Sequence, residues 1–108
     1  MQISELRKEI KSIKFDEVRK DTESYFEAVT LSLELPKLIT ILEKFFGLPV
    51  YPSKNELNSE AQAIADNFGG VRPNQILYFS NQEGEVIFAM LWPWSDEEHT
   101  TIKIGKNQ

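Results

Sequence analysis

The segment from Glu85 to Trp92 constrains the fold more than any other, because every residue after Glu85 is apolar. Side chains alternate between the two sides of a β-strand, so this segment has two apolar faces. A sheet that helices cover on one side only is expected to be polar on the other. One face carries Val86, Phe88, Met90 and Trp92, and the other carries Ile87, Ala89 and Leu91. We therefore expect both faces of this strand to be covered.

The preceding segment, from Gln75 to Ser80, repeats the two-faced pattern and predicts a neighbouring strand. Large apolar faces of this kind mark contacts with another element, subunit or molecule. The second face of this sheet could be covered by an N-terminal helix, by a second subunit or by a ligand.

The C-terminal third predicts a β-meander of three strands, over residues 75–80, 85–92 and 100–104. Residues 81–84 form the first hairpin loop, and the polar residues 95–98 form the second turn. Pro93 has no N–H to donate, so we expect it to end the pairing of its strand. Residues 105–108 are expected to fray.

The N-terminal half predicts a helix over residues 4–19, although the stripe of Leu6, Ile10 and Ile13 does not fix where it ends. Residues 25–35 alternate with period two and predict a strand, with a helix as the alternative. The apolar face of that strand would carry Val29, Leu31, Leu33 and Leu35.

Pro36 suits the first position of a second helix, and Gly47 suits its end. One face of this helix carries Leu38, Ile41, Leu42 and Phe45, and we expect Leu42 and Phe45 to pack on Leu31 and Leu33. A third helix is expected from about residue 56 to residue 68, ending at Gly69 and Gly70.

The element order α-β-α-α-β-β-β lacks regular βαβ alternation and favours the α+β class. We expect a single domain over residues 1–108, with an antiparallel sheet of about four strands and helices packed mainly on one face.

Composition narrows the classes of partner. The net charge of −5 opposes binding to nucleic acid, whose phosphates are neutralised by Lys and Arg. The longest apolar run is far shorter than the roughly 20 residues that a membrane-spanning helix needs. The chain has no cysteine, and small secreted domains often depend on disulfides. We expect a cytoplasmic domain that binds neither nucleic acid nor membrane.

The Trp92-Pro93-Trp94 segment is the strongest candidate for a binding site, because tryptophan brings a large contact area at low entropy cost. Tyr78 and Tyr51 are candidates to join it. We expect Trp92 to be largely buried, and Trp94 to be partly exposed with its indole N–H available. The alternative is that Trp92 belongs to the core and Trp94 covers a hairpin edge.

Arg72 is the remaining candidate, because a lone guanidinium in an acidic stretch can bind a carboxylate or phosphate through two hydrogen bonds. The alternative is a structural ion pair with Asp66. His99 follows three acidic residues, but neighbouring residues of a turn point in different directions. We therefore expect no metal, no cofactor and no catalytic group.

The sequence thus predicts a non-enzymatic interaction domain that forms a homodimer or binds a protein partner. It would act through an apolar sheet face and the Trp-Pro-Trp segment. The alternative is a small-molecule binding protein or small enzyme, with a pocket near Arg72, Tyr51 and the tryptophans.

Overall fold

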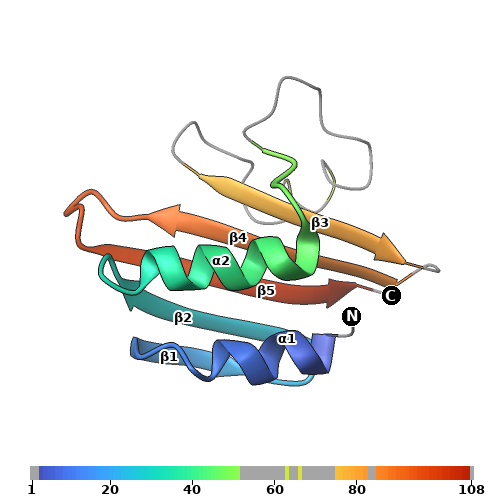
Figure 1. The fold of residues 1–108 in the computed structure, drawn as a ribbon, viewed down its shortest axis with the longest axis horizontal. Coiled ribbons are helices and arrows are strands. Elements are labelled where there is room, and N and C mark those ends of the chain that lie inside the picture. Colours follow the sequence, from blue (N-terminus) through green and yellow to red (C-terminus); the bar gives the residue numbers. More distant parts are fainter. Residues whose placement is uncertain (1–2, 52–62, 64–65, 67–74, 83–84, 108) are drawn as a thin grey trace.

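The computed structural model describes residues 3–51, 63, 66, 75–82 and 85–107. They contain one antiparallel sheet of five strands (Figure 1). The strands lie in the order β1-β2-β5-β4-β3. The elements along the chain are α1 (Ile3–Ile10), β1 (Phe15–Asp21), β2 (Tyr25–Leu31), α2 (Leu35–Phe46), β3 (Ile76–Gln82), β4 (Glu85–Pro93) and β5 (His99–Asn107). The α+β class with an antiparallel sheet is confirmed, with five strands in place of about four.

The additional strand, β1, occupies the second half of the helix expected over residues 4–19. That expectation is wrong beyond Ile10, where α1 ends and Ile13 bonds back to the carbonyl of Ile10 at 2.8 Å. Phe15 to Asp21 then pair with β2 as an edge strand, with two shifts of register along the pair. An exposed edge strand needs few apolar residues, so its sequence carries only a weak pattern.

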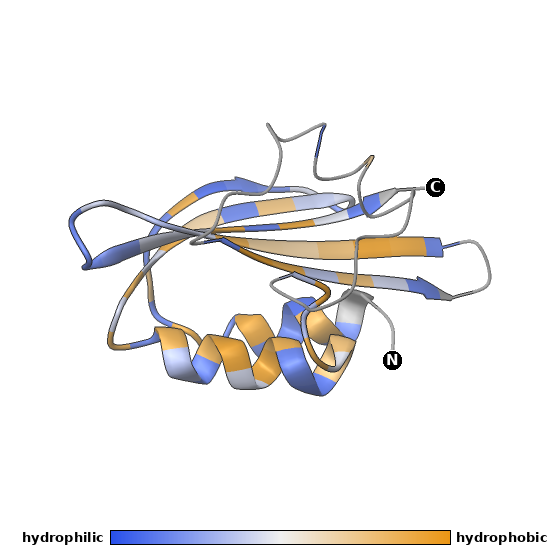
Figure 2. Cartoon of the chain, turned by 90° about the horizontal axis from the view of Figure 1, so that it is seen from above, coloured by the Kyte–Doolittle hydropathy of each residue, from blue (hydrophilic) through white to orange (hydrophobic). Residues whose placement is uncertain are grey.

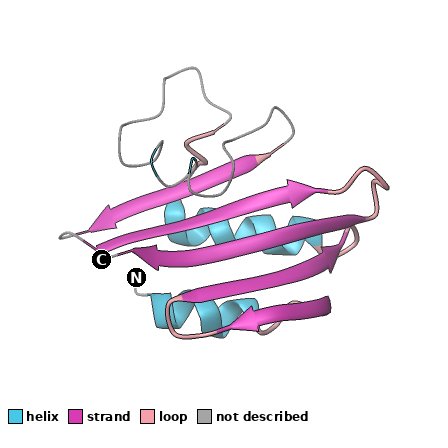
Figure 3. Ribbon diagram, turned by 180° about the vertical axis from the view of Figure 1, so that it is seen from behind, coloured by secondary structure: helices cyan, strands magenta, loops and turns pink. Residues whose placement is uncertain are grey.

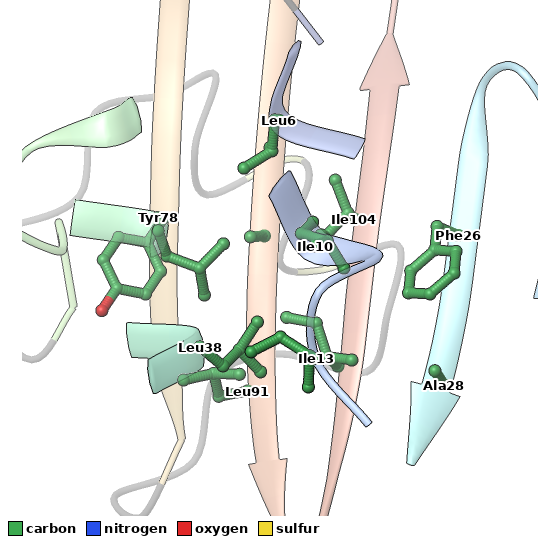
Figure 4. Close-up of a cluster of buried hydrophobic side chains, with 12 residues drawn as sticks. Leu6, Ile10, Ile13, Phe26, Ala28, Leu38, Tyr78, Leu91 and Ile104 are labelled. Atoms are coloured by element: carbon green, nitrogen blue, oxygen red, sulfur yellow. The ribbon is translucent and has the colours of Figure 1, made fainter. Parts of the chain in front are cut away.

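Both helices lie on the same face of the sheet (Figures 2 and 3). Their apolar stripes point into one buried cluster beneath them, part of which Figure 4 shows. The buried members are Leu6, Ile10, Ile13, Phe26, Ala28, Leu38, Leu42, Tyr78, Ala89, Leu91, Ile102 and Ile104. The N-terminal helix is therefore not the cover of the second face.

The strand expected over residues 25–35 is present but shorter, and the face assigned to the core is wrong. Phe26 and Ala28 belong to the cluster beneath the helices. Leu31 is exposed at the strand end, and Leu33 is 93% exposed. The cause is a turn that follows the strand at once, in which Glu34 and Leu35 bond back to the carbonyls of Leu31 and Ser32. Leu33 thus lies in the turn, and Leu35 begins α2.

The last strand, β5, lies in the middle of the sheet and pairs with both β2 and β4. It runs to Asn107, so the expected fraying from residue 105 is wrong within the described part. Pro93 does not end the pairing either, because it lies opposite Thr100 of β5. It stands beyond Leu91, the last residue of β4 that pairs with β3, so no described strand needs its N–H.

The second helix is present and begins one residue before the predicted Pro36, but Leu42 and Phe45 do not pack on Leu31 and Leu33, which are exposed. Pro36 stands in its first turn, and Gly47 follows its end with a φ of 82°, which glycine adopts without strain. The third helix expected over residues 56–68 lies outside the described residues, apart from Ala63 and Asp66, which are helical and exposed.

The packing of α2 predicts how two leucines differ. Leu42→Ala removes a fully buried side chain and leaves a cavity, so we expect a loss of about 2–5 kcal/mol in the free energy of unfolding. Leu33→Ala changes an exposed side chain and should stay within about 0.5 kcal/mol. Urea unfolding of both variants measures the difference, and equal losses would contradict the assignment of the core face.

Candidate functional site

The face of the sheet that points away from the helices carries a second apolar cluster. Its buried members are Leu77, Phe88 and Met90, and Val50, Tyr51, Phe79, Val86 and Trp92 pack against them. The Phe88 ring lies over Gly105 of β5, where a Cβ atom would come within 2.5 Å of the ring. Glycine at this position therefore leaves room for the Phe88 ring against the neighbouring strand.

Part of the cover on this face comes from the chain after α2. The N–H of Leu77 donates to the carbonyl of Tyr51 at 2.9 Å, and its own carbonyl accepts from Val50 at 2.9 Å. This short antiparallel bridge holds Val50 and Tyr51 beside β3, where both pack on the second cluster.

The predicted site residues do not all meet. Tyr51 and Trp92 share the second cluster, whereas Tyr78 lies on the opposite face beneath the helices, with its ring 5.7 Å from that of Phe46. Burial raises the pKa of Tyr78 to about 12. Arg72 lies outside the described residues. The pocket expected near Arg72, Tyr51 and the tryptophans thus stays a prediction. Tyr78 does not join Trp92, because the two belong to clusters on opposite faces.

Trp92 is held by a charge on its ring. The ammonium of Lys103 lies 3.7 Å from the ring centroid, which is the geometry of a cation–π contact. Among the described residues no group accepts a hydrogen bond from its buried indole Nε1. The ring packs against the cluster that contains Phe88 and Met90, as its position in the strand predicted, but it is half-buried where it was expected to be largely buried.

Trp94 lies on the same face and is 38% exposed. Its indole N–H was expected to be available, and that expectation is wrong, because the N–H donates to the Thr101 hydroxyl at 2.8 Å. The ring stacks on the imidazole of His99, with centroids 4.8 Å apart and planes 28° apart. The guanidinium of Arg19 lies 5.7 Å from the indole. We define the Trp94 surface as Trp94, His99 and Arg19 together with the nearby acidic residues Asp16, Asp96, Glu97 and Glu98.

His99 is fixed by carboxylates. Its Nδ1 lies 2.5 Å from Asp96 Oδ2, and its Nε2 lies 3.6 Å from Asp16 Oδ2 on β1. The hydrogen bond with Asp96, aided by the charges of Asp16 and Glu98, raises the pKa of His99. The pKa of Asp96 is lowered by the backbone N–H of Glu98 and by His99. The imidazolium form is therefore favoured, and it stacks on an electron-rich indole.

Three potential metal ligands, Asp96, Glu98 and His99, come within 4.8 Å of one another, although residues of a turn were expected to diverge. They converge because Asp96 closes the turn on itself. Its Oδ1 accepts from the N–H groups of Glu98 and His99 at 2.9 and 3.0 Å, while its Oδ2 faces the imidazole. Both carboxylate oxygens of Asp96 therefore make contacts that hold the turn, and a metal ion would have to displace these contacts.

Comparison of the chain with known protein-family models, curated proteins and solved structures finds no match. Among the described residues, no helix has both the length and the apolar character needed to cross a membrane. The chemistry of the Trp94 surface therefore has to be inferred from its own geometry.

His99, Arg19 and Asp16 are members of this surface that the sequence did not indicate. The spacing of Asp96 and His99 carried a usable signal, because an aspartate often accepts from the backbone two and three residues later in a turn. No signal in the sequence pointed to Arg19 and Asp16, because both had been assigned to a helix.

The linked pKa shifts predict a pH window of stability. His99 has a pKa above its ordinary 6.5, so its contribution is complete below 6.5 and is lost as the pH rises through the raised value. Asp96 has a pKa below 3.8, so its contribution is complete above 3.8 and is lost as the pH falls through the lowered value. Urea unfolding against pH should show both slopes.

His99→Gln is the matched test, because it removes the titrating group and keeps a polar side chain. We expect this variant to lose the fall in stability above pH 6.5, and the fluorescence of Trp94 to lose its change over the same interval. An unchanged slope in this variant would assign the titration to another group.

Proposed function

We propose that this chain is a non-enzymatic domain that binds a protein partner through the Trp94 surface. The observation that carries the proposal is an exposed tryptophan fixed by a hydrogen bond, a stacked ring and a nearby guanidinium. A side chain already held in one orientation loses little entropy on binding. Tryptophans of this kind are common among the residues that dominate binding energy.

The charge around Trp94 indicates the chemistry of the partner. Asp16 and Asp96 face His99, and the exposed Glu97 and Glu98 lie in the same turn. The guanidinium of Arg19 is already near carboxylates, at 3.3 Å from Glu17 and 3.9 Å from Glu27. Charge complementarity favours a partner that presents Lys or Arg side chains beside an apolar group.

A second copy of this chain fits the surface less well than a basic partner. The chain carries a net charge of −5, so two acidic turns would approach one another. A homodimer is therefore the weaker of the two occupants expected from the sequence. Since the chain has no cysteine, we propose the cytoplasm as its compartment.

A hydrolytic role for His99 is disfavoured by what its ring faces. The Asp96–His99 pair has the form of an orienting carboxylate and a base, as in a nucleophilic triad. However, Nε2 faces the carboxylate of Asp16 at 3.6 Å, where a nucleophilic mechanism requires a hydroxyl or thiol. The arrangement supports a fixed, positively charged ring and not a base.

Selection of peptides from a random displayed library tests the proposal. We expect the selected peptides to carry Lys or Arg beside an aromatic or aliphatic residue. Trp94→Ala should weaken their binding by about 30-fold, as the loss of a dominant tryptophan does. Leu48→Ala, which truncates an 80% exposed leucine after α2, is the matched control and should stay within about twofold.

Folding has to be measured alongside binding, because Trp94 also bonds to Thr101. Trp94→Ala should lose about 1 kcal/mol of stability with that hydrogen bond. Trp94→Phe keeps a ring on His99 and should retain part of the binding. Unchanged peptide affinity in a folded Trp94→Ala protein would overturn the proposal.

We expect the chain not to bind nucleic acid. The acidic charge predicts dissociation constants weaker than about 10⁻⁴ M for single- and double-stranded DNA and RNA at physiological salt. Fluorescence anisotropy with labelled oligonucleotides measures this. Sub-micromolar binding would contradict the charge argument.

A further inference from the structure

A pocket of about 300 Å³ lies between α1 and β1, on the face of the sheet opposite the Trp94 surface. Its apolar lining consists of Ile10, Ile13, Phe15, Val18 and Phe26, and its charged lining of Arg7, Lys11 and Asp21. The rings of Phe15 and Phe26 meet at 5.4 Å within it. Its volume corresponds to about ten water molecules, at the lower end of the range for small-molecule sites.

The two walls of the pocket are held by contacts between the helical segments and by irregular pairing of β1. Lys44 of α2 pairs with Glu9 at 2.8 Å, and Lys37 donates to the carbonyl of Ser12 at 3.2 Å. Two register shifts interrupt the pairing of β1 with β2, and such irregularities bend and twist a strand. Val18, which stands next to one of these shifts, is left 54% exposed.

The charges of the lining favour an anion. Arg7 of α1 and Lys11, which follows the end of α1, supply two cations against the single carboxylate of Asp21. The contact of Arg7 with Asp21 runs from Nη2 to Oδ1. A guanidinium has five N–H donors, so Arg7 retains donors for a second carboxylate. Lys11 is exposed at the rim.

We propose that this pocket binds a small amphipathic carboxylate. The apolar body of the ligand lies on the Phe15 and Phe26 rings, and its carboxylate meets Lys11 and the remaining donors of Arg7. A volume of about ten water molecules fits an unbranched chain of about eight to ten carbon atoms. This site is independent of the Trp94 surface, since the two lie on opposite faces.

Titration of the full chain with octanoate, octanol and octylammonium, followed by calorimetry and amide NMR, tests the proposal. We expect octanoate to bind one saturable site and to shift the amide signals of α1 and β1. Octanol should bind more weakly and octylammonium least, because the lining carries a net positive charge.

Lys11, which directly follows α1, and Lys8, which lies within α1, provide the matched comparison. Lys11→Gln should raise the dissociation constant for octanoate by about fivefold and leave that for octanol unchanged. Lys8 is exposed and does not line the pocket, so Lys8→Gln should stay within about twofold.

Three results would overturn the proposal. Octylammonium that binds as well as octanoate would show that charge plays no part. Equal effects of Lys8→Gln and Lys11→Gln would show attraction to the whole helix and not to this pocket. Shifts of the same α1 and β1 signals with protein concentration alone would assign the pocket to a second copy of the chain.

Discussion

The pairing of β5 with both of its neighbours holds the two halves of the chain together. β1 and β2 precede α2, and β3 and β4 come late in the sequence, so only β5 joins the two groups of described strands. Its pairs with β2 run from Tyr25–Gly105 to Leu31–His99, and backbone hydrogen bonds continue beyond both ends. Gly105, in this central strand, also makes room for the Phe88 ring of β4.

The position of β5 explains the arrangement of the Trp94 surface. Thr101, which accepts from Trp94, and His99, which stacks on it, both belong to β5. Asp16 and Arg19 come from β1, on the far side of β2. The turn between β4 and β5 therefore brings residues from the two ends of the chain to one place.

The elements that were predicted correctly from the sequence are those with a strong pattern of buried apolar residues. The two-faced β4 and the stripes of α1 and α2 are present, because burial selects apolar residues at every inward position. β1 was missed because its only two apolar residues, Phe15 and Val18, are three residues apart and show no alternation with period two. A strand at an exposed edge is specified by its neighbour's backbone, which leaves little trace in its side chains.

The face of β2 was misassigned for a related reason. Leu31 and Leu33 look like core residues in a count of apolar positions, yet the chain turns before they reach the interior. The site was predictable only in part. Trp92 and Trp94 stand out because tryptophan is rare. Arg19 and Asp16 reach the site only because β1 pairs with β2, and the periodicity of the sequence does not predict that pairing.

The composition of β1 also decides how copies of this protein can meet. Five of its seven residues, Asp16, Glu17, Arg19, Lys20 and Asp21, are charged, and its two register shifts distort the row of backbone groups along its outer side. Growth of a sheet into a fibre requires a receptive edge at both ends of every subunit. Because both features disfavour pairing along β1, we expect edge-to-edge association of copies to stop after a single contact through the edge at β3.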